Sequence, residues 1–339
     1  MLLTGMGIAL AGSLEGNYYA DLNKELFITP KSSSMAGSDA SLSRSAQPLS
    51  NPANLSVDSI SRVELAYAGF YRNTFSNSSL SYIGGIDPSS SFSISISYNL
   101  VPDIAVIDSG DYEPKDMANA SELFFRVGYG RKIVTFKNRL DVHVGAAMNG
   151  IRKNLIDLTG YGLGLDAGVN VYAHTIGVGA SLIIDNITTS YMHWTSSYQE
   201  FAYPHAKLGI GWEKEFPYIY GRLSVAYLSP DMFSNEGINS YGSDTMNTDD
   251  GSSSSSVSLQ DPQRLRVLKH PSIMIWGRYG AEYIIMNRIA FRMGYSLITS
   301  SFTFGAGLGL LDNRAGIDFA YLTHELAPTY KLSVNYKWL

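Results

Sequence analysis

The residues of this chain best suited to catalysis or metal binding are its six histidines: His143, His174, His193, His205, His270 and His324. Their spacing puts no ligand set on any one strand, so we expect no metal site. A serine hydrolase would need His143 or His324 beside a serine, and serines are too numerous here for such a pairing to be informative. We therefore predict no catalytic residues, no cofactor and no enzymatic activity.

A second candidate is the sequence Gly162-x-Gly164-x-x-Ala167, which matches a loose dinucleotide-binding fingerprint. That fingerprint requires a strand before it and a helix after it, whereas here it lies inside one alternating segment. We interpret its glycines as inward positions that make room for a packed N-terminal segment. The same role is predicted for a group of eight glycines: Gly162, Gly164, Gly168, Gly177, Gly179, Gly305, Gly307 and Gly309.

A third candidate is a set of charged residues that fall on the same face of their predicted strands as the other polar residues. Within it, three arginines near residues 278–292 would face Glu282 and Asp318, either as an ion-selective ring or as paired, solvated charges. The second interpretation is the simpler one. The interior charges predicted in this way are Arg126, Asp141, Asp166, Arg222, Arg278, Glu282, Arg288, Arg292 and Asp318.

The elements that must position these residues are strands, and the last one, Tyr330 to Trp338, shows the pattern most clearly. Large apolar residues alternate there with Lys331, Ser333, Asn335 and Lys337. Successive side chains of a strand point to opposite faces, so one face is apolar and the other polar. The pattern recurs in about fourteen segments from residue 62 onward, most of them near the 9 to 11 residues of a membrane-crossing strand.

The connections between these segments separate a membrane barrel from a soluble sandwich. Short connections (87–89, 134–138, 174–175, 215–217, 286–287 and 312–314) alternate with longer ones (102–120, 151–159, 186–203 and 229–271). Transmembrane barrels have short periplasmic turns and long external loops, and they exclude charges from the lipid face. We therefore predict an all-β, antiparallel transmembrane barrel of about 14 strands, with both termini periplasmic and the polar stretch 244–256 outside.

Composition agrees with a membrane barrel. The chain has 339 residues, of which 45% are hydrophobic and only 16% charged, and it contains no cysteine. No apolar run approaches the ~18 residues of a spanning helix. The net charge of -5, without a basic cluster, argues against nucleic acid as a partner.

The chain divides into three predicted parts. Residues 1–16 form an apolar segment, either the remnant of an export signal or an N-terminal part of the mature chain. Residues 17–61 lack alternation and are the expected plug, because a barrel of this size has a lumen too wide for its own side chains. Residues 62–339 are the barrel.

The predicted plug carries a short motif before the first strand. Ile28 to Asp39, followed by Asn51-Pro52-Ala53-Asn54-Leu55 and alternating strands, resembles the opening of the FadL superfamily of outer-membrane barrels, and most of all its PorV/PorQ branch. The match is to an Asn-Pro-Ala-x-Leu box at Asn51, Pro52, Ala53 and Leu55. The resemblance implies a fourteen-stranded barrel with an N-terminal hatch, in the outer membrane of a Gram-negative-type envelope and in contact with its lipid.

The resemblance implies two functions. The leading hypothesis is a PorV/PorQ-like partner in type IX-like secretion or surface attachment, which binds secreted proteins or a translocon. The alternative is a FadL-like transporter of hydrophobic small molecules, and a plain porin is a third reading. The transporter reading predicts an apolar lining of the lumen from Phe70, Phe124, Tyr172, Ile183 and Trp276.

Overall fold

The computed structural model describes residues 29–43, 48–57, 60–106, 116–137, 139–188, 190–196, 199–202, 204–232, 275–324 and 327–338. The apolar segment 1–16 and the polar stretch 244–256 lie outside the described residues. In the part of the chain that is described, no helix has the length and apolar character needed to cross a membrane.

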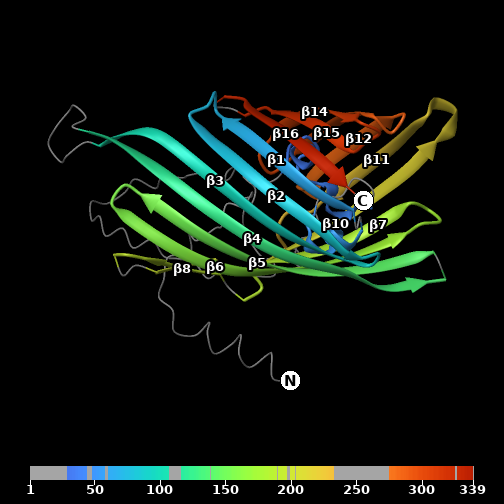
Figure 1. Cartoon of the computed structure of the whole chain (residues 1–339), viewed down its shortest axis with the longest axis horizontal. Helices are drawn as coiled ribbons and strands as arrows, with labels where there is room; N and C mark the ends of the chain where they lie inside the picture. Colours follow the sequence, from blue (N-terminus) through green and yellow to red (C-terminus); the bar gives the residue numbers. More distant parts are fainter. Residues whose placement is uncertain are drawn as a thin grey trace, which may run out of the picture.

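Fourteen antiparallel strands form a closed ring, in which each strand pairs with its neighbours along the chain (Figure 1). The ring closes where β1 pairs with β16, from Ser61 opposite Trp338 to Gly69 opposite Tyr330. The predicted antiparallel barrel is thereby confirmed. Its strands are β1 (Ser61–Phe70), β2 (Phe75–Asp87), β3 (Ser90–Val106), β4 (Asp116–Phe136), β5 (Leu140–Leu155), β6 (Leu158–Ala173), β7 (Val178–Asp185), β10 (His205–Phe216), β11 (Gly221–Leu228), β12 (Arg278–Ile285), β13 (Ile289–Ser296), β14 (Ser301–Leu310), β15 (Ala315–Leu322) and β16 (Thr329–Trp338).

The two faces of each strand are sorted as the period of two requires. On β16, Leu332 is 48% exposed and Val334 49%, whereas Ser333 between them is 1% exposed. Large apolar side chains thus cover the outside of the ring, and small or charged side chains point inward. Six of the predicted interior charges are buried: Arg126, Asp141, Asp166, Glu282, Arg292 and Asp318.

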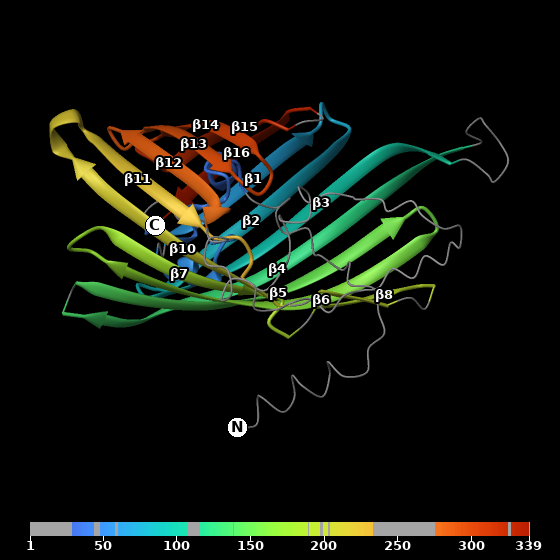
Figure 2. The ribbon, with the colours of Figure 1, turned by 180° about the vertical axis from the view of Figure 1, so that it is seen from behind.

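The wall of the ring is uneven in height. Strands β3 to β6 have 17, 21, 16 and 16 residues, whereas β11, β12 and β13 have 8 each. The long strands project past the rest of the barrel (Figures 1 and 2). The predicted loops 102–120 and 151–159 were therefore wrong over most of their length. Only residues 107–115 lie between β3 and β4, and a two-residue turn joins β5 to β6.

The predicted loop 186–203 was also wrong, because it contains the strands β8 (Ser190–Trp194) and β9 (Gln199–Ala202). β7 pairs with residues 167–173 of β6, and β8 pairs with residues 160–163 further along the same edge. β9 pairs with β8. The hairpin β8–β9 thus continues the tall part of the wall beyond β7 and β10.

Three short helical turns before β1 lie against the inside of the ring. They are α2 (Pro30–Ser33), η2 (Asp39–Ser41) and η3 (Pro52–Ser56), and we call residues 29–43 and 48–57 the inner segment. Its side chains are almost all buried, including Met35, Leu42 and Leu55. α2 contacts β14 to β16, η2 contacts β7, β10 and β11, and η3 contacts β3 to β6. The inner segment therefore touches walls on different sides of the ring.

Inward glycines provide the space for the inner segment, although they are not the set that the sequence predicted. Gly168, Gly179 and Gly305 do face it, at Asn51, Ser41 and Ser34. Gly162, Gly177, Gly307 and Gly309 instead face other parts of the wall. The remaining glycines that border the inner segment are Gly128, Gly130, Gly145, Gly209, Gly211, Gly280 and Gly294.

Candidate functional site in the barrel interior

The Asn51-Pro52-Ala53-Asn54-Leu55 box folds as a capped turn. Asn51 has an extended backbone (φ -144°, ψ 117°), as expected before proline, and its Oδ1 accepts a hydrogen bond of 3.0 Å from the amide of Ala53. Pro52 occupies the first turn of η3, where a missing amide proton costs nothing. Leu55 is 1% exposed, and every residue of the box is buried.

The box docks on three adjacent strands. Gly128 and Gly130 of β4 border Leu55, Gly145 of β5 borders Pro52, and Gly168 of β6 borders Asn51. A Cβ on any of these glycines would stand 3.0 Å or less from an atom of the box. The motif and the glycines of β4 to β6 thus form one interface between the inner segment and the wall.

Ser56 and His143 complete this interface, with 2.9 Å between Ser56 Oγ and His143 Nδ1. The Ser56 hydroxyl donates to the carbonyl of Ala53, so the hydroxyl oxygen accepts from His143 Nδ1–H. His143 is therefore not placed as a base for Ser56. Asp141 bonds to His174 and Thr135 rather than to His143. The geometry is that of a structural tie rather than a catalytic triad.

A buried polar layer lies next to the box, toward the tall end of the wall. Arg126 Nη1 is 2.8 Å from Asp166 Oδ2, and Asn149 Nδ2 donates to the same oxygen at 2.7 Å. Asp166 Oδ1 accepts from the amide of Asn186, which follows β7. The carboxylate is thus satisfied on both oxygens and holds β4, β5, β6 and the end of β7 together.

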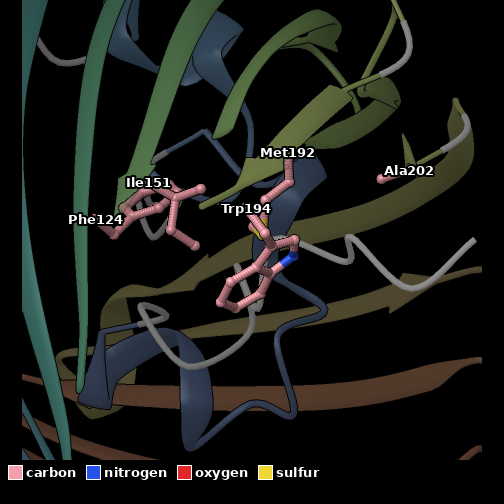
Figure 3. Close-up of a cluster of buried hydrophobic side chains, with 5 residues drawn as sticks. All are labelled: Phe124, Ile151, Met192, Trp194 and Ala202. Carbon is pink, nitrogen blue, oxygen red and sulfur yellow. The ribbon is translucent and has the colours of Figure 1, made fainter. Parts of the chain in front are cut away.

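One step further along the same inward face is an apolar cluster of Phe124, Ile151, Met192, Trp194 and Ala202 (Figure 3). Phe124 of β4 is paired with Ile151 of β5, and the next inward pair on these strands is Arg126 with Asn149. Met192 is fully buried and Trp194 is 8% exposed. Gly160 and Gly162 of β6 leave the space that Trp194, Met192 and Ile151 fill.

The cluster contains one polar atom of note. Trp194 Nε1 is buried and has no hydrogen-bond partner among the residues that the structure describes. A buried indole N–H normally finds a partner. The cluster therefore combines buried apolar side chains with a buried donor that has no partner among the described residues.

The predicted apolar lining is only partly brought together. Phe124 belongs to the apolar cluster, whereas Ile183 packs with Ala40 and Leu228 against η2. Phe70 stacks on Phe75 with 4.3 Å between ring centroids, and Tyr172 meets His174 edge-on. These four side chains are buried but lie in separate places.

Trp276 does not lie on the inner face of a strand. It is 47% exposed and precedes β12, which begins only at Arg278. Its predicted place in the lumen lining required an inward position within a strand, and Trp276 precedes the strand.

The charges on the opposite wall pair with one another and do not form a ring. Arg292 is 2.6 Å from Glu282 and 2.7 Å from Asp318, and Arg222 lies 4.0 Å from Glu282. Gly307 leaves the space in which Arg292 and Asp318 meet. Arg288 instead pairs with the exposed Asp312 in the next turn, at 3.0 Å. Arg278 is the first residue of β12 and is paired with Leu228 of β11 and Ser296 of β13.

Sequence reasoning missed Ile151, Met192, Trp194 and Ala202. All four lie in or beside segments that we had expected to be loops. The signal that could have found them is the alternation in Ser190 to Trp194, where Tyr191 and His193 are exposed and the residues between them buried. Among the described residues, no cluster of histidine and carboxylate side chains could hold a metal ion.

Comparison with known proteins found no matching family model and no matching curated protein. Two solved structures share the architecture. The Ralstonia pickettii toluene transporter TbuX is 15% identical, with a TM-score of 0.50 over 92% of this chain and 98% of that chain. The P. putida toluene transporter TodX is 12% identical, with a TM-score of 0.52 over 91% and 98%. Both are barrels of the FadL family, so the fold of this chain is similar to that of FadL-type barrels.

Proposed function

We propose that this protein is an outer-membrane barrel through which small hydrophobic molecules cross. The observation that carries the proposal is the buried apolar cluster on the inner face of the tall wall, where Phe124, Ile151, Met192, Trp194 and Ala202 pack together inside the ring. Ligand sites for such molecules are concave and mostly apolar, with few polar groups. The likeness of the fold to two toluene transporters supports the same reading.

In this proposal the inner segment is a plug. A molecule held at the apolar cluster meets first the Arg126–Asp166 layer and then the Asn51 to Leu55 box, both of which are buried. Passage toward the short-turn end therefore requires the box to move away from β4 to β6. The apolar cluster is the entry site, on the outer side, and both termini are periplasmic.

A role as a PorV/PorQ-like partner in protein secretion stays a prediction from the sequence resemblance. It predicts that the barrel is recovered from solubilised membranes together with secretion components or exported proteins. A plain porin would conduct ions steadily in planar bilayers, which requires an open lumen.

The test of transport compares uptake of radiolabelled toluene by bacterial cells that express the barrel with uptake by cells that carry an empty vector. Phe124 and Phe125 are adjacent on β4 and provide a matched pair, because Phe124 is 3% exposed on the inside and Phe125 41% exposed on the outside. We expect the barrel to speed uptake, Phe124→Ala to slow it by several-fold, and Phe125→Ala to leave it unchanged. Equal uptake with and without surface-expressed barrel would refute the proposal.

A further inference from the structure

A cavity of about 290 Å³ opens at the short-turn end of the ring, away from the apolar cluster. Its walls come from β1 and from β11 to β16, and one side is closed by Lys31 of α2. Its charged lining consists of six basic and two acidic side chains: Lys31, Arg62, Arg222, Arg288, Arg292, Lys337, Glu64 and Asp318.

The carboxylates around the cavity do not balance its cations. Glu64 and Asp318 line it, and two more carboxylates pair with arginines of the lining. Glu282 lies beside Arg292 and Arg222, and Asp312 lies beside Arg288. Six basic side chains stand against these four carboxylates, and Asp39 of the inner segment adds a fifth, because it interacts with Lys31 and Glu282. Basic side chains therefore remain in excess.

The excess positive charge has an identifiable location. Arg62 Nε is buried and has no hydrogen-bond partner, and neither Arg62, Lys31 nor Lys337 has a carboxylate within 4.0 Å, in the part of the chain that is described. An unsatisfied buried donor destabilises the folded protein. Because the Arg62 Nε donor lies beside an open cavity, a hydrogen-bond acceptor bound in that cavity could satisfy it.

We propose that this cavity binds a dianionic oxyanion, namely phosphate or a phosphate monoester, between Arg62 and Lys337 of the wall and Lys31 of the inner segment. Three cations without a carboxylate within 4.0 Å in the described part of the chain favour an anion that carries more than one charge, and guanidinium groups match the geometry of phosphate oxygens. The bound anion links the inner segment to β1 and β16. The inference goes beyond transport of hydrophobic molecules and does not depend on it.

The test is calorimetric titration of the full-length barrel, in a maltoside detergent without phosphate, with methyl phosphate at about pH 8, where the monoester is a dianion. We expect saturable binding with one site. Arg62→Gln and Lys337→Gln should each weaken it by about tenfold or more, and Arg131→Gln should not. Arg131 is the matched control because it is an exposed arginine at the same end of the ring and does not line the cavity.

Two further ligands identify the chemistry. Inorganic phosphate, a dianion at this pH, should bind with an affinity similar to that of methyl phosphate. Dimethyl phosphate, a monoanion like the diester of a lipid headgroup, should bind at least about tenfold more weakly than methyl phosphate. Equal affinity for methyl phosphate and dimethyl phosphate would overturn the proposal. So would equal binding by the Arg62→Gln, Lys337→Gln and Arg131→Gln proteins. The toluene uptake assay does not depend on phosphate binding. Failure of the phosphate proposal can therefore be told apart from failure of the transport proposal.

Discussion

Asn51 and Gly168 share one space: the side-chain amide of Asn51 fills the volume that a Cβ on Gly168 would need. The Nδ2 of Asn51 lies 3.5 Å from the carbonyl oxygen of Val169, the residue after Gly168. The Oδ1 of Asn51 caps η3 by accepting from the amide of Ala53. The residue that begins the box thus holds its own turn and touches the barrel wall at once. Substitutions on either side of this contact should separate the inner segment from the wall.

The first prediction concerns Gly145, which has the backbone of Pro52 and Ala53 directly over it. A Cβ at Gly145 would meet main-chain atoms, which cannot swing aside as a flexible side chain can. We expect Gly145→Ala to lower the free energy of unfolding by about 1–3 kcal/mol, through overpacking. The measurement is thermal unfolding in detergent, with protease sensitivity of the inner segment as a second readout.

Gly150→Ala is the matched control, because Gly150 is also on β5 and its nearest neighbour would be a side-chain carbon of Leu163 at 3.8 Å. That substitution should leave both readouts unchanged. If Gly145→Ala and Gly150→Ala behave alike, the inner segment is not seated on β5.

The second prediction concerns the Arg292–Glu282 pair. Glu282 is fully buried, so Arg292→Met would leave it only the longer 4.0 Å contact with Arg222, at a cost of about 3–5 kcal/mol. The double variant Arg292→Met/Glu282→Gln should recover much of this loss. Arg288→Met, which breaks only the exposed pair with Asp312, should cost about 1 kcal/mol or less. Thermal unfolding of the parent and the three variants checks the prediction, and a double variant no more stable than Arg292→Met would contradict it.

The orientation of side chains could be predicted from the sequence only where lipid covers the wall. Alternation is strict where one face meets hydrocarbon, so orientation was predicted correctly along most of β16 and its neighbours. Past the membrane both faces of a strand meet water, and the alternation fades. The ends of β3 and β5 were therefore predicted to be loops.

A period of two gives the face of a residue but not its height in the barrel. Phe70 and Phe124 were both placed inside, yet Phe70 stacks on Phe75 while Phe124 packs on Ile151. The ion pairs depend on the register between strands, which alternation alone does not give. Arg292 meets Glu282 because β12 and β13 pair them directly.

The third prediction is a pH dependence that comes from Asp39 in the inner segment. Burial raises the pKa of the Asp39 carboxyl from 3.8 to about 6, although the hydroxyl of Ser32 donates to it. Between about pH 4 and 6 the folded protein holds a proton there that the unfolded chain has released. Stability from this group is therefore highest below pH 4 and falls as the pH rises through 6, by about 3 kcal/mol in all.

Asp39→Asn should remove this part of the pH dependence, so that the variant gains unfolding temperature relative to the parent at about pH 7.5 and not at about pH 4. Asp157→Asn, in the exposed turn between β5 and β6, is the control and should not change the profile. Identical pH profiles for the parent and Asp39→Asn would show that Asp39 is hydrated in solution.

The last prediction tests which face of the ring meets lipid. The chain has no cysteine, so a single introduced cysteine can carry a nitroxide label without background labelling. Ile94 is 44% exposed on the outer face and Ser95 is 7% exposed on the inner face of the same strand. Oxygen concentrates in lipid hydrocarbon, whereas polar paramagnetic reagents stay in water. In liposomes we expect Ile94→Cys to be reached readily by oxygen and not by a nickel chelate, and Ser95→Cys to be reached poorly by oxygen.

Ile317 and Asp318 on β15 offer a second pair with the same expected order, so that agreement on two walls would establish a lipid-facing outer surface all round. Greater access of the chelate at Ile94 and Ile317 than at their neighbours would mean that the apolar face of the strands is not in the membrane.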